Sequence, residues 1–301
     1  MVQVPYHLSL CRRALEMTIL VPTGRWLRKN SLAFMAIAAA ALAAALVSAP
    51  RGTAAANIDL DQYRITFADE FDTLDVSAGG PGTRWIAHTP WAGDFGDAQF
   101  ADPTPGFPFT VADGILRIEA RKGPDGKWRS GLLASVDANN RGFSQQYGYF
   151  EIRAKLPEGL GLWPAFWLDS LIPAPSNDPS IEIDVLEHHG HFPSVYESIV
   201  TVWSKTNPKE TRAERRVNNV PRGSLYEDFH TYGVSVDPEW TVIYRDRGEI
   251  WRLKTPPEHR HKLMILVDLA LGSGWPIDQT PSPSYMYVDY IRAYERIDAN
   301  K

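Results

Sequence analysis

Ile181-Glu-Ile-Asp-Val-Leu-Glu187 is the stretch of this 301-residue sequence that decides the fold, because it interleaves three carboxylates with branched aliphatic residues. Such alternation is typical of a half-buried β-strand, in which residues two apart share one face. Glu182 and Asp184 would therefore point the same way, whereas strict alternation would turn Glu187 into the core as a costly unpaired charge. One extra residue, a β-bulge at Val185-Leu186, returns Glu187 to the face of the other two. We predict a bulged strand here.

The bulged strand would also bring two glutamates within reach of one another. Glu182 and Glu187 would lie about four strand steps apart, or roughly 13 Å between their Cα atoms. Side chains that lean together can bring the carboxyl groups to about 5 Å, the separation that retaining glycosidases use for a nucleophile and an acid/base. Asp184, between them, would influence which carboxyl keeps its proton. The alternative interpretation is a solvated acidic face above an aliphatic core.

The first 56 residues form a pattern of their own. A basic segment precedes an uncharged, alanine-rich run at residues 31–49, and Thr53-Ala-Ala-Ala56 offers an A-x-A cleavage site. This pattern is typical of a secretory signal peptide, with residues 1–16 as an upstream extension or the product of a wrong start codon ahead of Met17. We predict cleavage after Ala56 and a secreted or periplasmic protein. The alternative is an uncleaved membrane anchor, since the apolar run could just span a bilayer.

Residues 57–301 would form one domain with 25 basic and 35 acidic side chains. This negative balance argues against nucleic acid or an anionic membrane as a partner. The only cysteine, Cys11, lies in the leader, so the domain depends on its hydrophobic core, which a chain of this length can make large. We expect a monomer, without stable membrane association once the leader is cleaved.

The remaining sequence has an all-β pattern. Short runs rich in β-branched and aromatic residues alternate with turn signals such as Asp113-Gly114, which favours one antiparallel sandwich or barrel. The charged stretch Glu210–Arg216 is interpreted as a solvated loop. The ten predicted strands are Tyr63–Phe67, Phe109–Val111, Ile115–Ala120, Gly148–Ala154, Ile181–Leu186, Ser198–Trp203, His230–Val236, Thr241–Arg245, Lys262–Leu269 and Met286–Tyr294.

Tryptophan is frequent, with ten residues in the chain. Sugar rings stack their C–H faces on aromatic planes, so tryptophans beside a set of carboxylates predict a polysaccharide-binding groove. The candidates for substrate binding are the tryptophans expected at strand ends or in loops, Trp275 among them, and core filling is the alternative for each. Six tryptophans are expected at strand ends or in loops: Trp85, Trp91, Trp163, Trp167, Trp203 and Trp275.

Longer motifs surround these residues. They are Tyr147-Gly-Tyr-Phe-Glu-Ile-Arg-Ala-Lys-Leu-Pro157, Gly161-Leu-Trp-Pro-Ala-Phe-Trp-Leu168 and Glu182-Ile-Asp-Val-Leu-Glu187. Three outer segments accompany them: Asp69-Glu-Phe-Asp72, Phe229-His-Thr-Tyr232 and Met286-Tyr-Val-Asp-Tyr-Ile-Arg-Ala-Tyr294. Together they resemble glycoside hydrolase family 16, over most of the predicted domain.

The resemblance implies a concanavalin A-like β-jelly roll of two curved antiparallel sheets with an open concave cleft. It implies endo-acting hydrolysis of a β-linked polysaccharide with retention of configuration and without a cofactor for catalysis. By position, Glu182 matches the nucleophile, Glu187 the acid/base and Asp184 the assisting carboxylate.

The resemblance also implies binding residues. Trp163 and Trp167 match aromatic residues of the subsites nearest the cleaved bond, and His230 resembles a polar cleft position. Many family members hold a structural calcium ion. Its ligand positions correspond to Glu70, the carbonyl of Gly114 and Asp289, which are the hard oxygen donors that calcium prefers.

The substrate stays open at this point. Ser198–Ser204 and Asp268–Gly274 depart from the H-G-T-x-H-like and N-L-A-x-G-G segments of β-glucan-cleaving relatives, and residues 172–180 form a proline-rich insertion. A β-1,3- or β-1,3-1,4-glucan and a bacterial exopolysaccharide of the succinoglycan type are therefore both retained, with agarose or carrageenan as a weaker third. The alternatives to a hydrolase are a non-catalytic carbohydrate-binding jelly roll and a transglycosylase that uses the same carboxylates.

Overall fold

The computed structural model describes residues 56–91, 93–173 and 175–297. The predicted leader lies outside the described residues up to position 55, and so does its alanine-rich run. The residues from Asn57 onward form one compact unit. Within the described part of the chain, no helix has the length and apolar character needed to cross a bilayer.

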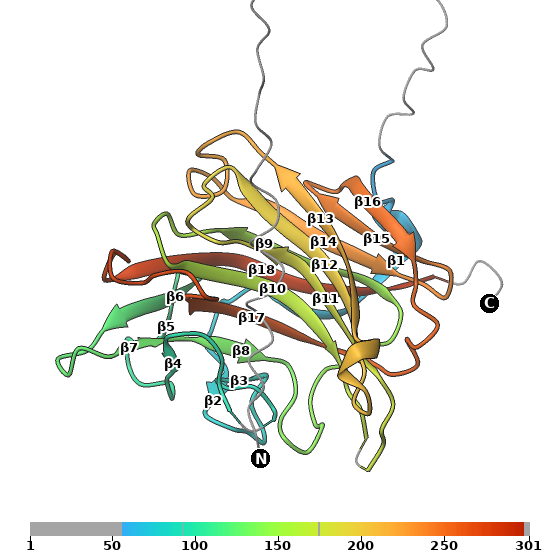
Figure 1. The fold of residues 1–301 in the computed structure, drawn as a ribbon, viewed down its shortest axis with the longest axis horizontal. Helices are drawn as coiled ribbons and strands as arrows, with labels where there is room; N and C mark the ends of the chain where they lie inside the picture. The colour runs from blue at the N-terminus through green and yellow to red at the C-terminus, as the bar shows by residue number, and fades with distance from the viewer. Residues whose placement is uncertain (1–55, 92, 174, 298–301) are drawn as a thin grey trace, which may run out of the picture. The chain divides into compact units, whose positions relative to one another are not determined.

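Two β-sheets build this unit (Figure 1). The ten-stranded sheet has the order β16 (Gly248–Lys254), β15 (Trp240–Arg245), β14 (His230–Val236), β9 (Gly148–Lys155), β18 (Ser284–Arg296), β6 (Ile115–Lys122), β7 (Trp128–Ser130) and β4 (Gln99–Phe100), with β1 (Tyr63–Asp69) beside β18 and β5 (Phe109–Ala112) beside β6. The eight-stranded sheet has the order β13 (Arg212–Asn219), β12 (Val195–Trp203), β11 (Ser180–Glu187), β10 (Leu162–Ser170), β17 (Leu263–Leu271), β8 (Leu132–Ala134), β3 (Trp85–Ile86) and β2 (Val76–Ser77). Two short 3-10 turns, η1 (Leu60–Gln62) and η2 (Pro208–Glu210), complete the elements found among the described residues.

The predicted all-β class and all ten predicted strands are confirmed. The expectation of purely antiparallel sheets is wrong in two places, because β2 pairs with β3 and β4 pairs with β7 in parallel. The interpretation of Glu210–Arg216 as a loop is also wrong, since β13 begins at Arg212 and pairs with β12 along its whole length. β13 is an edge strand with mostly exposed side chains, and solvated edge strands tolerate charges that a central strand would not.

The core lies between the two sheets. Ile181 and Ile183 of β11 meet Ile152 of β9 and Val234 of β14 in one buried apolar cluster. A second apolar cluster covers part of the other side of the eight-stranded sheet, where Phe95 and neighbouring residues pack over β10, β17 and β8. For this reason all nine side chains of β17 are buried, although they alternate between both sides of the sheet.

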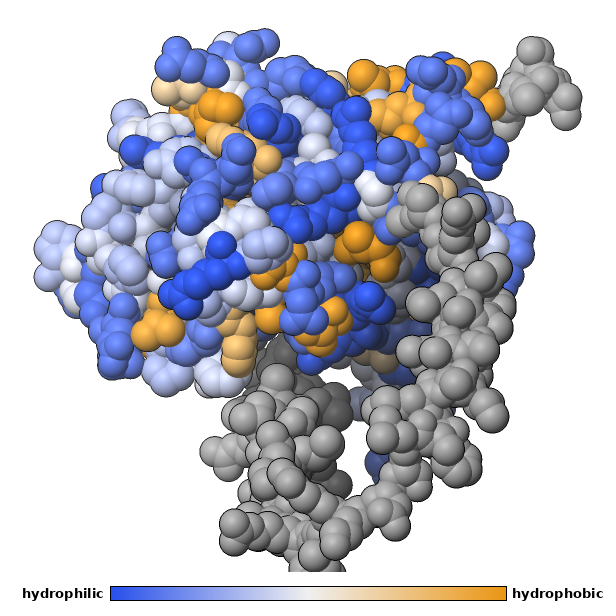
Figure 2. Space-filling model, turned by 90° about the horizontal axis from the view of Figure 1, so that it is seen from above, coloured by the Kyte–Doolittle hydropathy of each residue, from blue (hydrophilic) through white to orange (hydrophobic). Residues whose placement is uncertain are grey.

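The surface visible in Figure 2 is mostly hydrophilic, with apolar side chains in small separate patches. Large hydrophobic side chains that are exposed come from scattered positions, such as Ile65, Trp91 and Phe192. Such scattered positions are ordinary for a folded chain.

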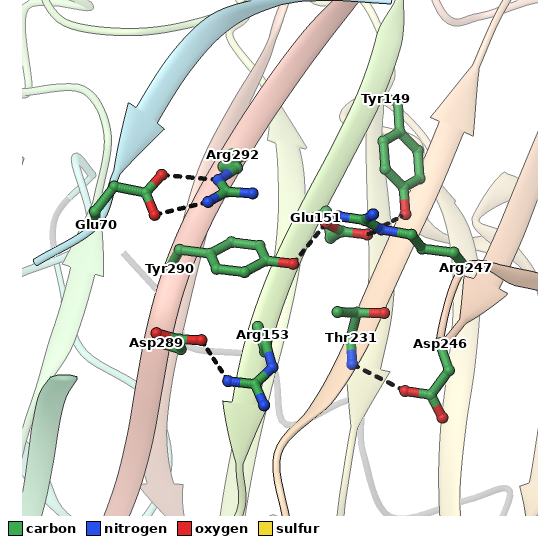
Figure 3. A network of polar contacts seen from close by, with 10 residues as sticks. All are labelled: Glu70, Tyr149, Glu151, Arg153, Thr231, Asp246, Arg247, Asp289, Tyr290 and Arg292. Carbon is green, nitrogen blue, oxygen red and sulfur yellow. Dashed lines mark hydrogen bonds and ion pairs between the residues drawn. The ribbon is translucent and has the colours of Figure 1, made fainter. Parts of the chain in front are cut away.

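A buried carboxylate lies on the side of the ten-stranded sheet that faces away from the core (Figure 3). Glu151 of β9 has no exposed surface. Its oxygens accept hydrogen bonds from the hydroxyls of Tyr149 (2.7 Å) and Tyr290 (2.9 Å), and from Nε and Nη2 of Arg247 (3.1 and 3.0 Å). Because Tyr290 lies on β18 and Arg247 in the turn between β15 and β16, this group ties three parts of the sheet together.

Candidate active site

The predicted β-bulge lies in β11. Asp184 pairs with Ile199 of β12, whereas Glu187 pairs with Glu197, so three residue steps on β11 oppose two on β12. Val185 and Leu186 are both fully buried in the core, and Glu182, Asp184 and Glu187 are partly exposed. The bulge at Val185-Leu186 is thus confirmed, and it places the three carboxylates on one side of the eight-stranded sheet. We call this side the carboxylate face.

Glu182 and Asp184 have a strong tendency to keep their protons. The pKa of Glu182 is raised to about 8, first by burial and then by the nearby charges of Asp169 and Glu187, against the opposing effect of a hydrogen bond from the Trp203 side chain. Burial, followed by the charges of Glu182 and Glu187, raises the pKa of Asp184 well above its ordinary value. Because these carboxyl groups interact with one another, each apparent pKa belongs to the set of carboxylates rather than to a single residue. Perturbed carboxyl groups of this kind gather at catalytic sites.

Glu187 has a more polar environment. Its Oε1 accepts a hydrogen bond of 2.8 Å from Nε1 of Trp163, and Nε2 of His189 lies 3.8 Å from the same oxygen. The His189 ring stacks on Trp163 with 5.9 Å between the ring centroids. The two glutamates at the ends of the bulged segment therefore occupy different surroundings, as a nucleophile and an acid/base require.

Three further acidic residues of the carboxylate face were not predicted. Asp169 of β10 lies directly opposite Glu182, and Glu197 of β12 lies directly opposite Glu187. Asp268 of β17 accepts hydrogen bonds from Nε1 of Trp167 (2.8 Å) and from the backbone of Ala270 (3.1 Å), and burial raises its pKa to about 7. Asp268 could have been found from the sequence, because it is the single acidic residue in the apolar segment Leu263–Leu271. The positions of Asp169 and Glu197 beside the glutamates follow only from the strand register.

Aromatic side chains continue the carboxylate face beyond the acids. Phe95 lies 5.5 Å from Trp163 and 5.9 Å from Trp167 between ring centroids, and Trp91 lies 6.1 Å from Trp167. Trp167 is only 6% exposed, whereas Trp91 is 43% exposed. The predicted pair Trp163 and Trp167 is thus brought beside the carboxylates, but Trp91 offers more free ring surface to a sugar.

The other two predicted binding residues have different positions. Trp275 follows β17 and contacts His191 and Phe192, each with 5.1 Å between ring centroids, in the loop that follows Glu187. His230 lies on β14 in the ten-stranded sheet, and its Nδ1 is 2.9 Å from Asp246. The prediction that His230 lines the cleft is not supported, because β14 belongs to the sheet opposite the one that carries the carboxylates.

The sequence comparison decides the family. Residues 110–292 match the model of the family named glycosyl hydrolases family 16. The chain belongs to glycosyl hydrolases family 16. The matched segment contains the whole of β11 and both tryptophans beside it.

Named relatives agree with the family 16 assignment. The chain is 33% identical to endo-1,3-1,4-beta-glycanase EglC of Rhizobium meliloti over 78% of its own length and 52% of the relative's. It is also 33% identical to endo-1,3-1,4-beta-glycanase ExsH of the same organism, over 81% of its own length and 54% of the relative's. The chain thus spans about half the length of these curated relatives.

Solved structures of similar fold support the jelly-roll prediction. SCLam, a non-specific endo-beta-1,3(4)-glucanase from family GH16, has a TM-score of 0.62 with this chain at 25% identity, covering 81% of this chain and 97% of SCLam. The predicted jelly-roll sandwich is therefore confirmed. The open concave cleft stays a prediction.

Two of the three residues predicted for calcium in this family 16 chain, Glu70 and Asp289, are engaged by arginines (Figure 3). Glu70 accepts two hydrogen bonds from Arg292, at 2.7 and 2.8 Å, and Asp289 forms an ion pair with Arg153. Gly114 lies next to Glu70, since a Cβ atom on it would be 3.6 Å from the Glu70 carbonyl. A calcium ion would have to displace both guanidinium groups, so this arrangement does not fit the metal.

A chelator experiment tests the calcium prediction. We expect EDTA to leave the thermal unfolding midpoint unchanged, because arginines already engage Glu70 and Asp289. An ion bound to the folded chain would stabilise it by mass action, so its removal would lower the midpoint. A fall in the midpoint with EDTA, reversed by added Ca²⁺ but not by Mg²⁺, would contradict this expectation and show that calcium binds and stabilises the folded chain.

Proposed function

We propose that this chain is a secreted, endo-acting glycoside hydrolase that cleaves β-linked glucan with retention of configuration. The observation that carries the proposal is the bulged strand β11, which presents Glu182, Asp184 and Glu187 on one face beside Trp163 and Trp167. A purely structural strand has no need of three carboxylates on one face, two of which, Glu182 and Asp184, have raised pKa values. The printed names of EglC, ExsH and SCLam favour a β-glucan with 1,3 and 1,4 linkages as the first substrate to test.

The chemistry follows a two-step displacement. Glu182, once ionised, attacks the anomeric carbon, while Glu187 gives its proton to the glycosidic oxygen that leaves. The glycosyl–oxygen bond breaks and an ester between Glu182 and the sugar forms. Glu187, now a carboxylate, removes a proton from water, and the resulting attack releases the sugar and restores both residues. Asp184 lies between them and keeps a proton available to the set.

Several groups of the carboxylate face would hold the reacting residues in place. The Trp163 Nε1–H donates to Glu187, and the Trp203 side chain donates to Glu182. Each hydrogen bond favours the ionised form of its carboxylate, which is the form that Glu182 needs for attack and Glu187 needs for the second step. Trp91, with its exposed ring, would stack on a sugar of a neighbouring subsite.

Depolymerisation of defined polymers tests the proposal. Purified residues 57–301 are incubated with lichenan, laminarin, a succinoglycan-type exopolysaccharide and agarose, and the anomer formed first is recorded by proton NMR. We expect cleavage of a β-1,3-1,4- or β-1,3-glucan with the β-anomer appearing first. Initial formation of the α-anomer would contradict retention. Binding without cleavage of any polymer would favour a carbohydrate-binding module, and longer products on addition of acceptor oligosaccharides would favour a transglycosylase.

A further inference from the structure

Each of the two glutamates proposed to react has a second carboxylate directly across the strand ladder. Asp169 of β10 pairs in register with Glu182, and Glu197 of β12 pairs in register with Glu187. Residues directly opposite on antiparallel strands have Cβ atoms about 5 Å apart, so two negative charges in these positions repel each other and are destabilising. Neither Asp169 nor Glu197 belongs to the E-x-D-x-x-E segment.

Asp169 shares its surroundings with Glu182. The backbone N–H of Ser170 donates to Oδ1 of Asp169 at 2.7 Å, and Met264 of β17, on the other side, brings no charge. The pKa of Asp169 is raised to about 7, because the effect of burial exceeds the lowering by the Ser170 hydrogen bond and the charge of Lys205. The charge of Asp169 in turn acts on both Glu182 and Asp184.

Glu197 shares its surroundings with Glu187. Polar side-chain atoms of Glu187, Glu197 and His189 lie within 4.8 Å of one another. Nη1 of Arg215, on the edge strand β13, lies 3.4 Å from Oε1 of Glu197. Burial raises the pKa of Glu197, Arg215 lowers it and Glu187 raises it.

We propose that Asp169 and Glu197 are positioning residues that shift the working pH range of the site upward, Asp169 by delaying ionisation of the nucleophile and Glu197 by delaying ionisation of the acid/base. The inference rests on the proposed function of Glu182 and Glu187. A negative neighbour makes it harder for a carboxyl group to lose its proton. Asp169 therefore moves the acid limb of the pH profile of kcat/KM to higher pH, and Glu197 does the same for the alkaline limb.

The groups that face the two reacting carboxylates come from every neighbouring strand. Glu182 faces Asp169, Asp184 and the Trp203 side chain, and Lys205 acts on Asp169. Glu187 faces Trp163, His189 and Glu197, and it also interacts with Asp268. The two limbs of the pH profile therefore report apparent pKa values of the coupled carboxylates. Each variant below measures how far removal of one charge shifts those values.

The pH profile of kcat/KM on a soluble β-glucan tests the inference. Asp169→Asn is expected to move the acid limb down by about one pH unit, and Glu197→Gln to move the alkaline limb down by about the same amount, as expected for one charge at close range. Each variant should leave the opposite limb in place. Asp125→Asn, in the turn before β7 and paired with Arg129, is the control that should move neither limb.

Two exposed cations provide an independent test through the same two carboxylates. Lys205 lowers the pKa of Asp169 and Arg215 lowers that of Glu197, so removal of either cation keeps its neighbouring carboxyl neutral over a wider pH range. Lys205→Gln is therefore expected to move the acid limb down, and Arg215→Gln the alkaline limb down, each by about half a pH unit because exposed charges are screened. These variants keep the inference testable if Asp169→Asn or Glu197→Gln fails to fold. Limbs that stay in place in all four variants, while the unchanged chain is active, would overturn the inference. A chain that cleaves no polymer would instead overturn the proposed function.

Discussion

Glu182→Gln is expected to reduce kcat/KM on β-glucan by about 10³-fold or more, the scale on which removal of one member of a catalytic set acts. The amide has nearly the same shape as the carboxylate, so the hydrogen bond position beside Trp203 is kept. It cannot attack the anomeric carbon, so the covalent step is lost. Polymer binding, measured by affinity electrophoresis, should be retained.

Chemical rescue distinguishes the roles of the two glutamates. Azide added to Glu182→Ala should take the place of the missing nucleophile and give a glycosyl azide of inverted configuration. Azide added to Glu187→Ala should attack the glycosyl–enzyme and give a product of retained configuration, best seen with an activated aryl glycoside that needs no proton on the leaving oxygen. Asp61→Asn, an exposed residue of η1, is the activity control. Full activity of Glu182→Gln, or the same azide product from both variants, would contradict the assignment.

The bulged strand could be predicted from the sequence because a local conflict required it. Glu187 is out of phase with Glu182 and Asp184, and only an extra residue brings it to their face without burying a charge. The pairing of β11 with β12 confirms the shift at Val185-Leu186. Information of this kind is contained in a few consecutive side chains and needs no knowledge of the partner strand.

Other features of the site depend on which strands become neighbours. Asp169 and Glu197 face the reacting glutamates only through the registers of β10 and β12 with β11, and no local pattern sets those registers. The resemblance suggested that His230 lies at the cleft, but β14 joins the ten-stranded sheet, and the pattern of β14 alone does not specify which sheet it joins. Strand β10 was not among the predicted strands, and it contains Pro164, a residue that ordinarily argues against a central strand. The structure accommodates the proline because it lies just beyond Ala165, where the pairing of β10 with β11 ends.

Arg247→Met is expected to lower the free energy of unfolding by about 3 kcal/mol, the lower end of the range for breaking a buried ion pair. The side chain of Glu151 is completely buried, and it would lose its only cationic partner among the described residues while keeping the hydroxyls of Tyr149 and Tyr290. The lower end applies because the Arg247 side chain itself is 40% exposed and partly screened. Methionine keeps much of the length and apolar stem of arginine, so the change is chiefly one of charge. Urea unfolding followed by tryptophan fluorescence gives the measurement.

Two further variants separate the buried charge from other effects of substitution. Arg64→Met removes an ion pair with Glu295 in which both side chains are well exposed, and it should cost less than about 1 kcal/mol. The double variant Glu151→Gln with Arg247→Met should recover part of the lost stability, because a neutral amide needs no counter-charge and can still accept hydrogen bonds from Tyr149 and Tyr290. Equal losses for Arg247→Met and Arg64→Met would show that the Glu151 group does not hold the ten-stranded sheet together. A recovery in the double variant would locate the cost of Arg247→Met in the uncompensated carboxylate rather than in the turn between β15 and β16.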